Sequence, residues 1–388
     1  MKTNVKNFYA DFTKDELWLI EENQWHKNLQ NIKESQFTLG NGYLGIRGAL
    51  EEIPYDAMPG TYLAGVYDKI GSQVDELVNL PNPVNFKFTI KGEKLDLSAA
   101  DILEHKRTLN MKKAVLSRRT LYKDTKKRRY DYQSLRFVSL HNRNIGAMQI
   151  AVTALDAACV MDVNTGIDTS VSNLGILSEG RKRHFRIREL GRAHNAGYLE
   201  IETLEKKHVI VYWSGFYYEI NGKKIPKKDN IFRLKVKKGE TVVFTKIFYI
   251  KRFPYTEKHA GYKEETARAF NKAFRSKFSA LLDNHIRMWQ RLWNKADIKI
   301  EGTKNLQENL RFNIYHMLAC AHYDSGLSSI GARTLSGEGY RGHIFWDEIF
   351  GLTFYDLHIP GISQALLLYR YRRLPKAREY AREKGIKS

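Results

Sequence analysis

The residues best suited to chemistry lie in one short stretch, LSGEGYRGHIFWDEIF, at positions 335–350. Within it Trp346 is followed directly by Asp347 and Glu348, and Arg341 lies a few residues earlier. A sugar presents apolar C–H faces and a rim of hydroxyls, so a sugar site needs a flat aromatic surface beside a charged hydrogen-bond acceptor. Trp346 and Asp347 supply both, which makes this stretch a candidate carbohydrate site.

Other interpretations of the stretch stay open. The apolar residues among 345–350 suit the buried stripe of a helix that begins near residue 343, whose positive N-terminal end favours the two carboxylates. The three glycines suit a pocket wall or an ordinary turn. Neither Gly-Lys-Ser nor a preceding strand accompanies them, so they do not match a nucleotide-binding pattern. Arg341 suits a carboxylate partner or a sugar hydroxyl, and His343 equally suits a core position.

Composition indicates a globular chain of 388 residues, 43% of them hydrophobic, with room for two domains. No run approaches the roughly 18 apolar residues of a membrane span, and the first residues are charged where a signal peptide is apolar. We therefore expect a cytoplasmic protein without membrane contact. Cys159 and Cys320 lie in apolar surroundings without metal-ligand spacing, which predicts buried free thiols and no metal site.

The formal net charge of +21 makes nucleic-acid binding the first alternative to consider. The densest basic runs, KKRR at 126–129 and GRKRH at 180–184, are short and lie near alternating stretches such as RRYDYQSLRFVSL. On a strand this alternation places charges on one solvated face. No zinc-finger, RNA-recognition or basic-zipper pattern is present in the sequence. We expect a solvated basic surface and no nucleic-acid partner.

The hydrophobic period divides the chain into three parts. Residues 1–262 read as an N-terminal antiparallel β-sandwich, with turns at Gly92 in FKFTIKGEKLDL, at Asn221-Gly222 and at Lys238-Gly239, each predicting a hairpin. Residues 263–302 read as a helical linker, one helix of some thirty residues with an apolar face that runs through Ala267, Phe270, Phe274, Phe278, Leu281, His285, Trp289 and Leu292.

Residues 303–388 read as the first helices of a larger helical domain. One helix is expected at about 304–322, another from Pro360, and a third with Pro375 in its first turn and Gly385 as its terminator. These 86 residues have room for about four helices with loops, and paired helices of this kind would suit a toroid of helical hairpins.

The stretch 335–350 resembles the central motif of glycoside hydrolase family 65, which includes maltose, kojibiose and trehalose phosphorylases. Three other stretches resemble the same family: ESQFTLGNGYLGIRGALEE (34–52), HIRMWQRLWNKADI (285–298) and LLLYRYRRLPKAREYAREKG (366–385). Many members read FWDTEIF where this chain has the shorter FWDEIF. That departure bears on the identity of the substrate, because the remaining resemblance covers nearly the whole chain.

The resemblance implies a fold and a reaction. The fold is mainly β plus α: an N-terminal β-super-sandwich, a helical linker and an (α/α)6 barrel, here incomplete. The reaction is phosphorolysis with inversion, in which phosphate attacks an α-linked glucose disaccharide while a glutamic acid protonates the leaving oxygen, without metal or organic cofactor. Inorganic phosphate is a co-substrate. The family's glucose-holding Trp-Asp pair falls on Trp346 and Asp347, with Arg341 and Glu348 beside it, and a homodimer is a further expectation.

By the same resemblance the family's general-acid glutamate and its phosphate-binding residues fall beyond Ser388. Glu338, Asp347 and Glu348 are the carboxylates within the stretch, but neighbouring helical residues such as Asp347 and Glu348 point about 100° apart, and no catalytic residue is assigned. The expectation is a truncated phosphorylase-type chain that is inactive alone. Two alternatives remain: a trehalase-like hydrolase of the same family, and a non-catalytic carbohydrate-binding fragment.

Overall fold

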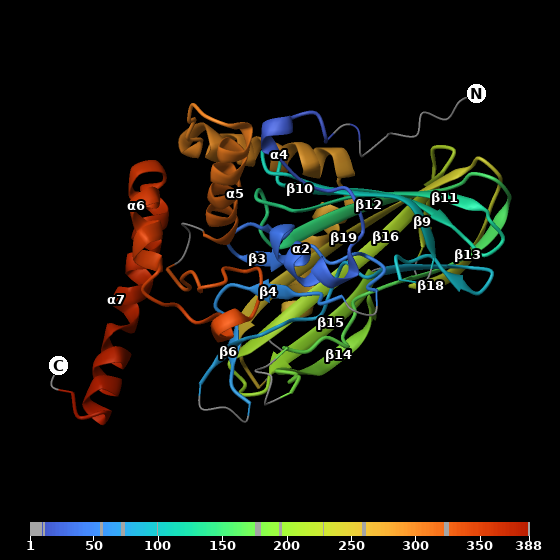
Figure 1. Cartoon of the computed structure of the whole chain (residues 1–388). Coiled ribbons are helices and arrows are strands. Elements are labelled where there is room, and N and C mark those ends of the chain that lie inside the picture. The colour runs from blue at the N-terminus through green and yellow to red at the C-terminus, as the bar shows by residue number, and fades with distance from the viewer. Residues whose placement is uncertain are drawn as a thin grey trace.

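The computed structural model describes residues 10, 12–54, 57–70, 74–98, 100–174, 180–193, 196–227, 229–257, 261–321 and 326–386. Within these ranges antiparallel sheets come first and helices follow, which confirms the predicted β-sandwich with helices after it (Figure 1). The strands are β1 (Leu19–Glu22), β2 (Leu39–Gly40), β3 (Leu44–Ile46), β4 (Thr61–Leu63), β5 (Tyr67–Asp68), β6 (Glu76–Leu77), β7 (Phe86–Ile90), β8 (Glu93–Lys94), β9 (Asp101–Asn110), β10 (Val115–Lys123), β11 (Arg129–Val138), β12 (Ile145–Ala154), β13 (Cys159–Thr165), β14 (Phe185–Ala193), β15 (Ala196–Thr203), β16 (His208–Ile220), β17 (Lys223–Lys227), β18 (Ile231–Val236) and β19 (Thr241–Pro254). The helices are α2 (Gln30–Gln36), α3 (Tyr262–Arg275), α4 (Phe278–Ala296), α5 (Lys304–Cys320), α6 (Glu348–His358), α7 (Pro360–Glu383) and the short 3-10 helices η1 (Glu16–Trp18), η2 (Lys27–Leu29) and η3 (Gly339–Gly342).

The largest sheet has ten antiparallel strands in the order β1-β9-β10-β11-β12-β19-β16-β15-β14, with β17 paired to β16. A four-stranded sheet, β18-β13-β7-β8, packs against one face of it. The ring of Phe88 on β7 lies 6.1 Å from that of Tyr132 on β11 and 5.3 Å from that of Phe244 on β19. The main hydrophobic core therefore lies between two sheets, as in a sandwich.

Helices α3 and α4 cover the opposite face of the large sheet. Phe270 of α3 stacks on Trp213 of β16, and the ring of Phe278 on α4 lies 5.6 Å from that of Phe137 on β11. The predicted single thirty-residue helix is wrong, because Ser276 and the next residue have extended backbone with ψ of 149° and 140°. Because of this break, two shorter helices follow the twisted surface of the sheet, whereas one straight helix of this length would lose contact with it.

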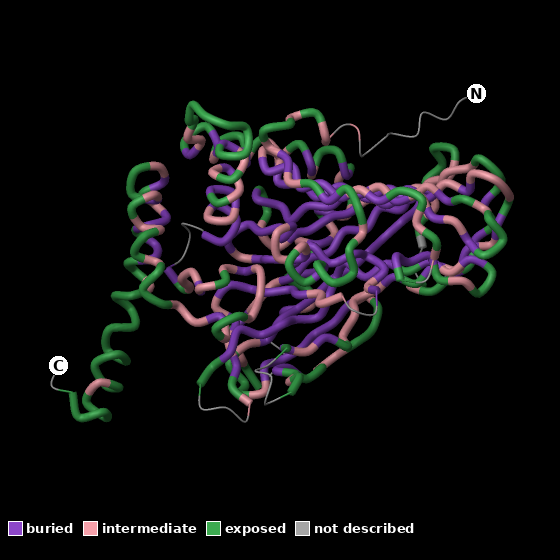
Figure 2. The backbone as a smooth tube through the Cα atoms, in the orientation of Figure 1, coloured by how far each residue is buried: buried purple, intermediate pink, exposed green. Residues whose placement is uncertain are grey.

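Lys126, Lys127 and Arg129 of the basic run KKRR are exposed, as predicted, but burial on both faces corrects the expectation that the alternating stretch after them has one solvated face. Figure 2 shows the strands of the large sheet as mostly buried. Arg136 on β11 is buried, lies 3.2 Å from Glu51 and donates to the carbonyl of Ala49. His184, from the basic run GRKRH, is fully buried. Alternation in the sequence indicates a solvated face only where nothing covers that face.

Turn chemistry was predicted correctly at two of three positions. Asn221 and Gly222 both have positive φ and join β16 to β17 as a hairpin, and Gly92 joins β7 to β8. The third prediction is wrong as a hairpin. Gly239 does turn the chain at φ 72°, but β18 pairs with β13 in the four-stranded sheet while β19 pairs with β12 and β16 in the large one. A turn residue does not state which sheet the next strand joins.

The last helices extend away from the sandwich (Figure 1). Helix α5 lies near the predicted 304–322, with residue 322 outside the described part, and the ring of Tyr315 stacks 5.2 Å from that of Trp289 on α4. Pro360 begins α7 and Gly385 follows its end, as predicted. Pro375 does not start a new helix but lies inside α7, which is exposed there.

Both cysteines are buried free thiols, which confirms the sequence prediction. Among the described helices, none combines the length and apolarity that crossing a membrane requires. The described residues likewise contain no group of three or more His, Cys, Asp or Glu side chains arranged to hold a metal ion.

Candidate functional site

The stretch 335–350 is anchored to the sandwich at its start. Leu335 packs in a small buried cluster with Tyr62 and Leu77. A Cβ added to Gly45 on β3 would lie only 2.4 Å from the Cβ of Leu335, so the two backbones approach as closely as they do because this residue is glycine. Two stretches that carry the family resemblance, 34–52 and 335–350, are therefore in direct contact.

Arg47 reinforces this anchor. One guanidinium nitrogen donates to the carbonyl of Ser336 at 2.6 Å and to the hydroxyl of Ser35 at 2.8 Å. Its remaining nitrogens donate to Asn31 and to the carbonyl of Met58 at 2.9 Å. Because these donors already have protein acceptors, Arg47 shapes the site rather than offering its charge to a ligand.

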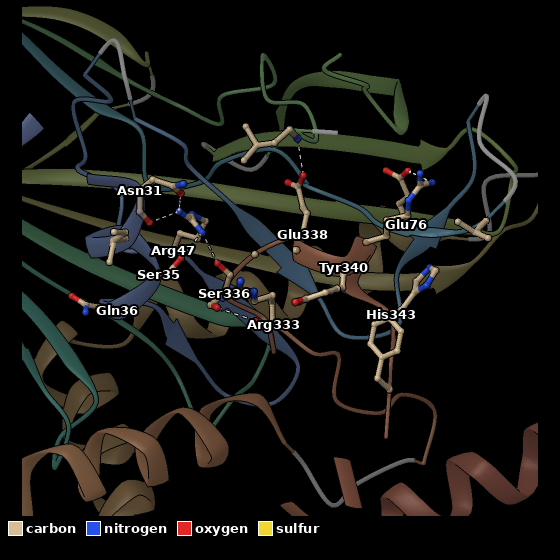
Figure 3. Close-up of a pocket in the computed structure, with 17 residues that line it drawn as sticks. Asn31, Ser35, Gln36, Arg47, Glu76, Arg333, Ser336, Glu338, Tyr340 and His343 are labelled. Carbon is tan, nitrogen blue, oxygen red and sulfur yellow. Dashed lines mark hydrogen bonds and ion pairs between the residues drawn. The ribbon is translucent and has the colours of Figure 1, made fainter. Parts of the chain in front are cut away.

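Glu338 comes next and reaches back into the sandwich (Figure 3). Its Oε1 accepts a hydrogen bond from the Tyr62 hydroxyl at 3.0 Å, and its Oε2 accepts one from the backbone N–H of Leu174 at 2.7 Å. Burial raises the pKa of Glu338 to about 7. A carboxyl with this pKa can exchange a proton at neutral pH, but both of its oxygens are engaged by the protein.

The chain then makes a tight turn, η3, that presents two side chains. Tyr340 and Arg341 have left-handed backbone, with φ of 55° and 58°, which is costly for residues other than glycine. Gly342 follows with φ 70°, and its carbonyl accepts a hydrogen bond from the Tyr67 hydroxyl at 2.7 Å. The guanidinium of Arg341 lies 2.9 Å from the carboxylate of Glu76 on β6. Contacts to β5 and β6 thus hold the turn in its strained form.

A cavity of about 880 Å³ opens between this turn and the sandwich (Figure 3). Its size lies in the range of small-molecule sites. The aromatic rings of Tyr340 and Phe345, the guanidinium groups of Arg333 and Arg341 and the carboxylate of Glu338 contribute to its lining. Such a mixture of apolar surface and hydrogen-bonding groups suits a sugar.

The four residues predicted to bind substrate do not all lie in this cavity. Arg341 lines it, whereas Trp346, Asp347 and Glu348 do not. Trp346 is 67% exposed, with its ring 5.3 Å from that of Phe350, and Asp347 is exposed just before α6.

Glu348 is engaged within the protein. Its carboxylate accepts hydrogen bonds from the hydroxyl of Ser329 and from the guanidinium of Arg370 on α7. Glu348 therefore ties the start of α6 to α7, and its Oε1 also accepts a hydrogen bond from the backbone N–H of Ile330 at 3.4 Å.

The interpretation of residues 345–350 as a buried helical stripe is wrong. Helix α6 begins at Glu348 rather than near residue 343. Phe345, Trp346, Ile349 and Phe350 are all exposed. The contacts to β5 and β6 hold the residues before α6 outside a helix, and these four apolar side chains stay largely exposed in the described part of the chain.

Sequence reasoning missed the sandwich residues of the site. Glu76, Tyr62, Tyr67 and His184 lie far from the stretch 335–350 in the sequence, in segments without a recognisable motif. No local signal could have assigned them, because their role depends on how β4, β5 and β6 fold against the turn. His184 was grouped with solvated basic residues, although it is fully buried between two carboxylates.

Comparison with known proteins places the chain in a family. Residues 20–292 match the model of "Glycosyl hydrolase family 65, N-terminal domain", and residues 311–388 match that of the "Glycosyl hydrolase family 65 central catalytic domain". A kojibiose phosphorylase of Caldanaerobacter subterraneus subsp. tengcongensis is 36% identical over 389 residues, and one of Thermoanaerobacter brockii is 33% identical over 395 residues. Each alignment covers 96% of this chain and 50% of the relative.

A solved structure described as a putative kojibiose phosphorylase from human microbiome has the same fold. It superposes with a TM-score of 0.84 at 21% identity, covering 95% of this chain and 50% of that one. The chain thus spans about half the length of the curated relatives it matches. Since the N-terminal model alone covers well over half of its residues, the chain belongs to glycosyl hydrolase family 65.

Proposed function

We propose that this chain forms the N-terminal sandwich and the first part of the sugar-binding region of a disaccharide phosphorylase that acts in the cytoplasm. The reaction would convert an α-linked glucose disaccharide and inorganic phosphate into β-glucose 1-phosphate and a free sugar, with inversion and without a metal. The observation that carries the proposal is the cavity beside Arg341, which lies next to the stretch that resembles the family's glucose-binding motif.

The proposed division of the chain follows the change in secondary structure. Residues 1–262 are the β-sandwich, residues 263–302 the helical linker, and residues 303–388 the opening part of the helical catalytic domain. The linker helices α3 and α4 pack on the outer face of the large sheet, whereas α5 contacts β2. In this division the sandwich forms one wall of the cavity and the catalytic part forms the other.

The site residues take distinct proposed roles. Trp346 offers a flat apolar surface to a glucose ring, and Asp347 accepts hydrogen bonds from its hydroxyls, since both side chains are exposed at the same end of α6. Arg341 donates to hydroxyls of the sugar in the cavity. Glu348 supports the pair by tying α6 to α7 through Arg370.

Catalysis requires groups that the resemblance places outside these 388 residues. The general acid and the phosphate-binding residues belong, in this proposal, to the half of the relatives' length that the chain does not span. Glu338 is no substitute, because both its oxygens accept hydrogen bonds from the sandwich. The 388-residue chain alone should therefore bind a glucoside without turning it over.

The test is an assay of phosphate dependence. The 388-residue chain is incubated with kojibiose, maltose, nigerose or trehalose, with and without phosphate, beside a protein in which the same residues are joined to a full-length catalytic part. Glucose 1-phosphate should form only in the joined protein and only with phosphate. Its release by the 388-residue chain would overturn the assignment of the acid. Free glucose without phosphate would favour a trehalase-like hydrolase instead.

A binding module without catalysis is the second candidate. The observation that favours it is that Trp346 and the cavity are both open to solvent while the carboxylates of Glu338 and Glu348 accept hydrogen bonds from protein donors. This candidate predicts the same sugar binding by the chain, and no turnover by the joined protein.

A further inference from the structure

A chain of buried ionisable groups runs from the interior of the sandwich to the cavity. The imidazole of His184 lies between two carboxylates, with Nδ1 3.6 Å from Oδ2 of Asp68 and Nε2 3.3 Å from Oε2 of Glu76. The other oxygen of Glu76 accepts a hydrogen bond from Arg341 at 2.9 Å. Asp68 is in turn fixed by the backbone N–H of Glu205, which donates to Oδ1 at 2.9 Å. The four side chains form one connected line.

Burial makes this arrangement expensive to maintain. The side chains of Asp68 and His184 are fully buried and that of Glu76 is 6% exposed. Within the described part of the chain, neither ring nitrogen of His184 nor Oδ2 of Asp68 makes a hydrogen bond of ordinary geometry. Groups removed from water without full hydrogen bonding destabilise the folded state. A core that only had to be stable would place apolar side chains here.

Arg341, the last of these four side chains, lies in a turn whose backbone is strained. Arg341 and Tyr340 both adopt left-handed torsions, and the turn that carries them is held by the Tyr67 hydroxyl and by the contact between Arg341 and Glu76. Strain of this kind persists where the surroundings over-determine the conformation, and it is concentrated at functional sites. The side chain of Arg341 is 21% exposed and lines the cavity.

We propose that Glu76, backed by His184 and Asp68, is a positioning residue that fixes the guanidinium of Arg341 at the cavity wall for hydrogen bonding to hydroxyls of the disaccharide. The proposal rests on the proposed function and extends it to the sandwich. The pairing with Glu76 offsets the charge of Arg341, which favours a neutral polyol over an anion as its ligand, and the guanidinium is partly exposed at the cavity wall, where it presents planar N–H groups.

A purely structural role is the competing explanation, because the same contact also pins the turn to β6. Glu76→Gln separates the two. It keeps the size of the side chain and one hydrogen-bond acceptor but removes the charge that orients Arg341. Asp75→Asn is the matched control, since Asp75 is the neighbouring residue and pairs through its carboxylate with Lys207 at 2.6 Å rather than with Arg341.

The first readout needs no ligand. The N–H signals of the Arg341 side chain are followed by NMR in arginine-labelled protein, assigned by comparison with Arg341→Lys. The native chain and Asp75→Asn should show a slowly exchanging, ordered guanidinium, and Glu76→Gln should show fast exchange. His184→Gln provides a second variant with the same expectation. An Arg341 that is equally ordered in Glu76→Gln and in the native chain would overturn the positioning role.

The second readout is affinity, measured by calorimetric titration with kojibiose and separately with inorganic phosphate. Glu76→Gln should weaken kojibiose binding at least about tenfold, with Asp75→Asn unchanged. Adding Glu76→Gln to Arg341→Ala should cause no further loss of kojibiose affinity, because Glu76 acts through Arg341. If Glu76→Gln binds kojibiose as tightly as the native chain but has a lower melting temperature, the contact between Glu76 and Arg341 has only a structural role. Loss of phosphate binding instead would overturn the choice of a sugar as ligand.

The two proposals fail in different ways. If the native chain binds none of the tested disaccharides although Arg341 is ordered, the proposed function fails and the sugar half of this inference fails with it. If the native chain binds kojibiose and Glu76→Gln binds equally well, the proposed function stands and the positioning role of Glu76 is refuted.

Discussion

At the scale of single residues, Glu338 is a carboxyl group held by two donors of the sandwich. Its pKa is raised to about 7 by burial, against an ordinary value of 4.5. The folded protein therefore keeps a proton on Glu338 up to about pH 7, while the unfolded chain releases it near pH 4.5. The stability gained from this proton is present below pH 4.5 and is lost as the pH rises through 7.

Glu338→Gln removes this pH dependence. Relative to the variant, the native chain should lose on the order of 1–3 kcal/mol of unfolding free energy between pH 4.5 and 7.5. Urea unfolding of both proteins at these two pH values gives the difference, in which the other titrating groups cancel. Parallel pH profiles for the two proteins would contradict the assignment.

Trp346 gives the second prediction at this scale. Trp346→Ala should weaken binding of a glucoside several-fold, because it removes a stacking surface, and should leave the melting temperature unchanged, because the side chain is mostly exposed. Tyr380→Ala is the control, since Tyr380 is a similarly exposed aromatic residue near the end of α7. Equal affinity of all three proteins would exclude Trp346 from the sugar site.

The residue types in the sequence indicated which side chains could bind a sugar, but not which residues hold those side chains in place. The aromatic and carboxylate pair at 346 and 347 was apparent from the sequence, and Arg341 could be predicted to lie near a sugar or a carboxylate. That its partner is Glu76, and that His184 lies behind Glu76, depends on strands that meet only in the fold. The assignment of Trp346 and Asp347 to substrate binding stays a prediction.

At the scale of elements, Lys246 on β19 is a test of how the two sheets of the sandwich pack. Its ammonium group is buried between them and donates to the carbonyls of Asn85 and Gly166 at 3.0 and 2.8 Å. Burial lowers its pKa to about 7 from 10.5. Between about pH 7 and pH 10.5, Lys246 is protonated in the unfolded chain but mostly not in the folded protein. The free energy of unfolding therefore rises with pH in this range.

Lys246→Met removes the titrating group. The stability of the variant relative to the native chain should therefore fall by a few kcal/mol as the pH rises from 7 to 10. Chemical unfolding at these two pH values measures the change, and the constant cost of leaving two carbonyls unpaired does not affect it. If the difference in unfolding free energy between Lys246→Met and the native chain is the same at both pH values, Lys246 is not buried as described.

Elements were predictable where local chemistry decides them. The Asn221-Gly222 hairpin and the starts of α5 and α7 follow from turn residues and apolar period. Local chemistry could not show that β18 and β19 enter different sheets, nor that Ser276 and Lys277 interrupt the linker helix. Both are set by what the elements pack against.

At the scale of the whole molecule, α6 and α7 carry an apolar surface that the described chain leaves open. Ile349, Phe350, Leu357, Leu367 and Tyr371 are each more than half exposed. Exposed apolar patches of this kind mark interaction surfaces. We expect copies of the chain to associate through this surface when nothing else covers it.

Sedimentation velocity over a range of protein concentrations tests this expectation. The native chain should form larger species as its concentration rises, and the double variant Leu357→Glu, Leu367→Glu should remain monomeric with an unchanged melting temperature. A native chain that stays monomeric at every concentration would contradict the prediction.

The overall order of β-sandwich and helices could be predicted from the hydrophobic period and from the family resemblance. The cavity could not, because its walls come from segments hundreds of positions apart, such as Ser35 and Ser336, which meet through Arg47. Long-range contacts of this kind leave no trace in the local pattern of either segment.

The most direct test for a disaccharide site in these residues is a calorimetric titration of the 388-residue chain with kojibiose, maltose, nigerose and trehalose. Saturable binding of at least one of these sugars at a single site per chain is expected. Absence of binding by all four, in a chain shown by circular dichroism to be folded, would contradict the claim that these residues form part of a disaccharide site.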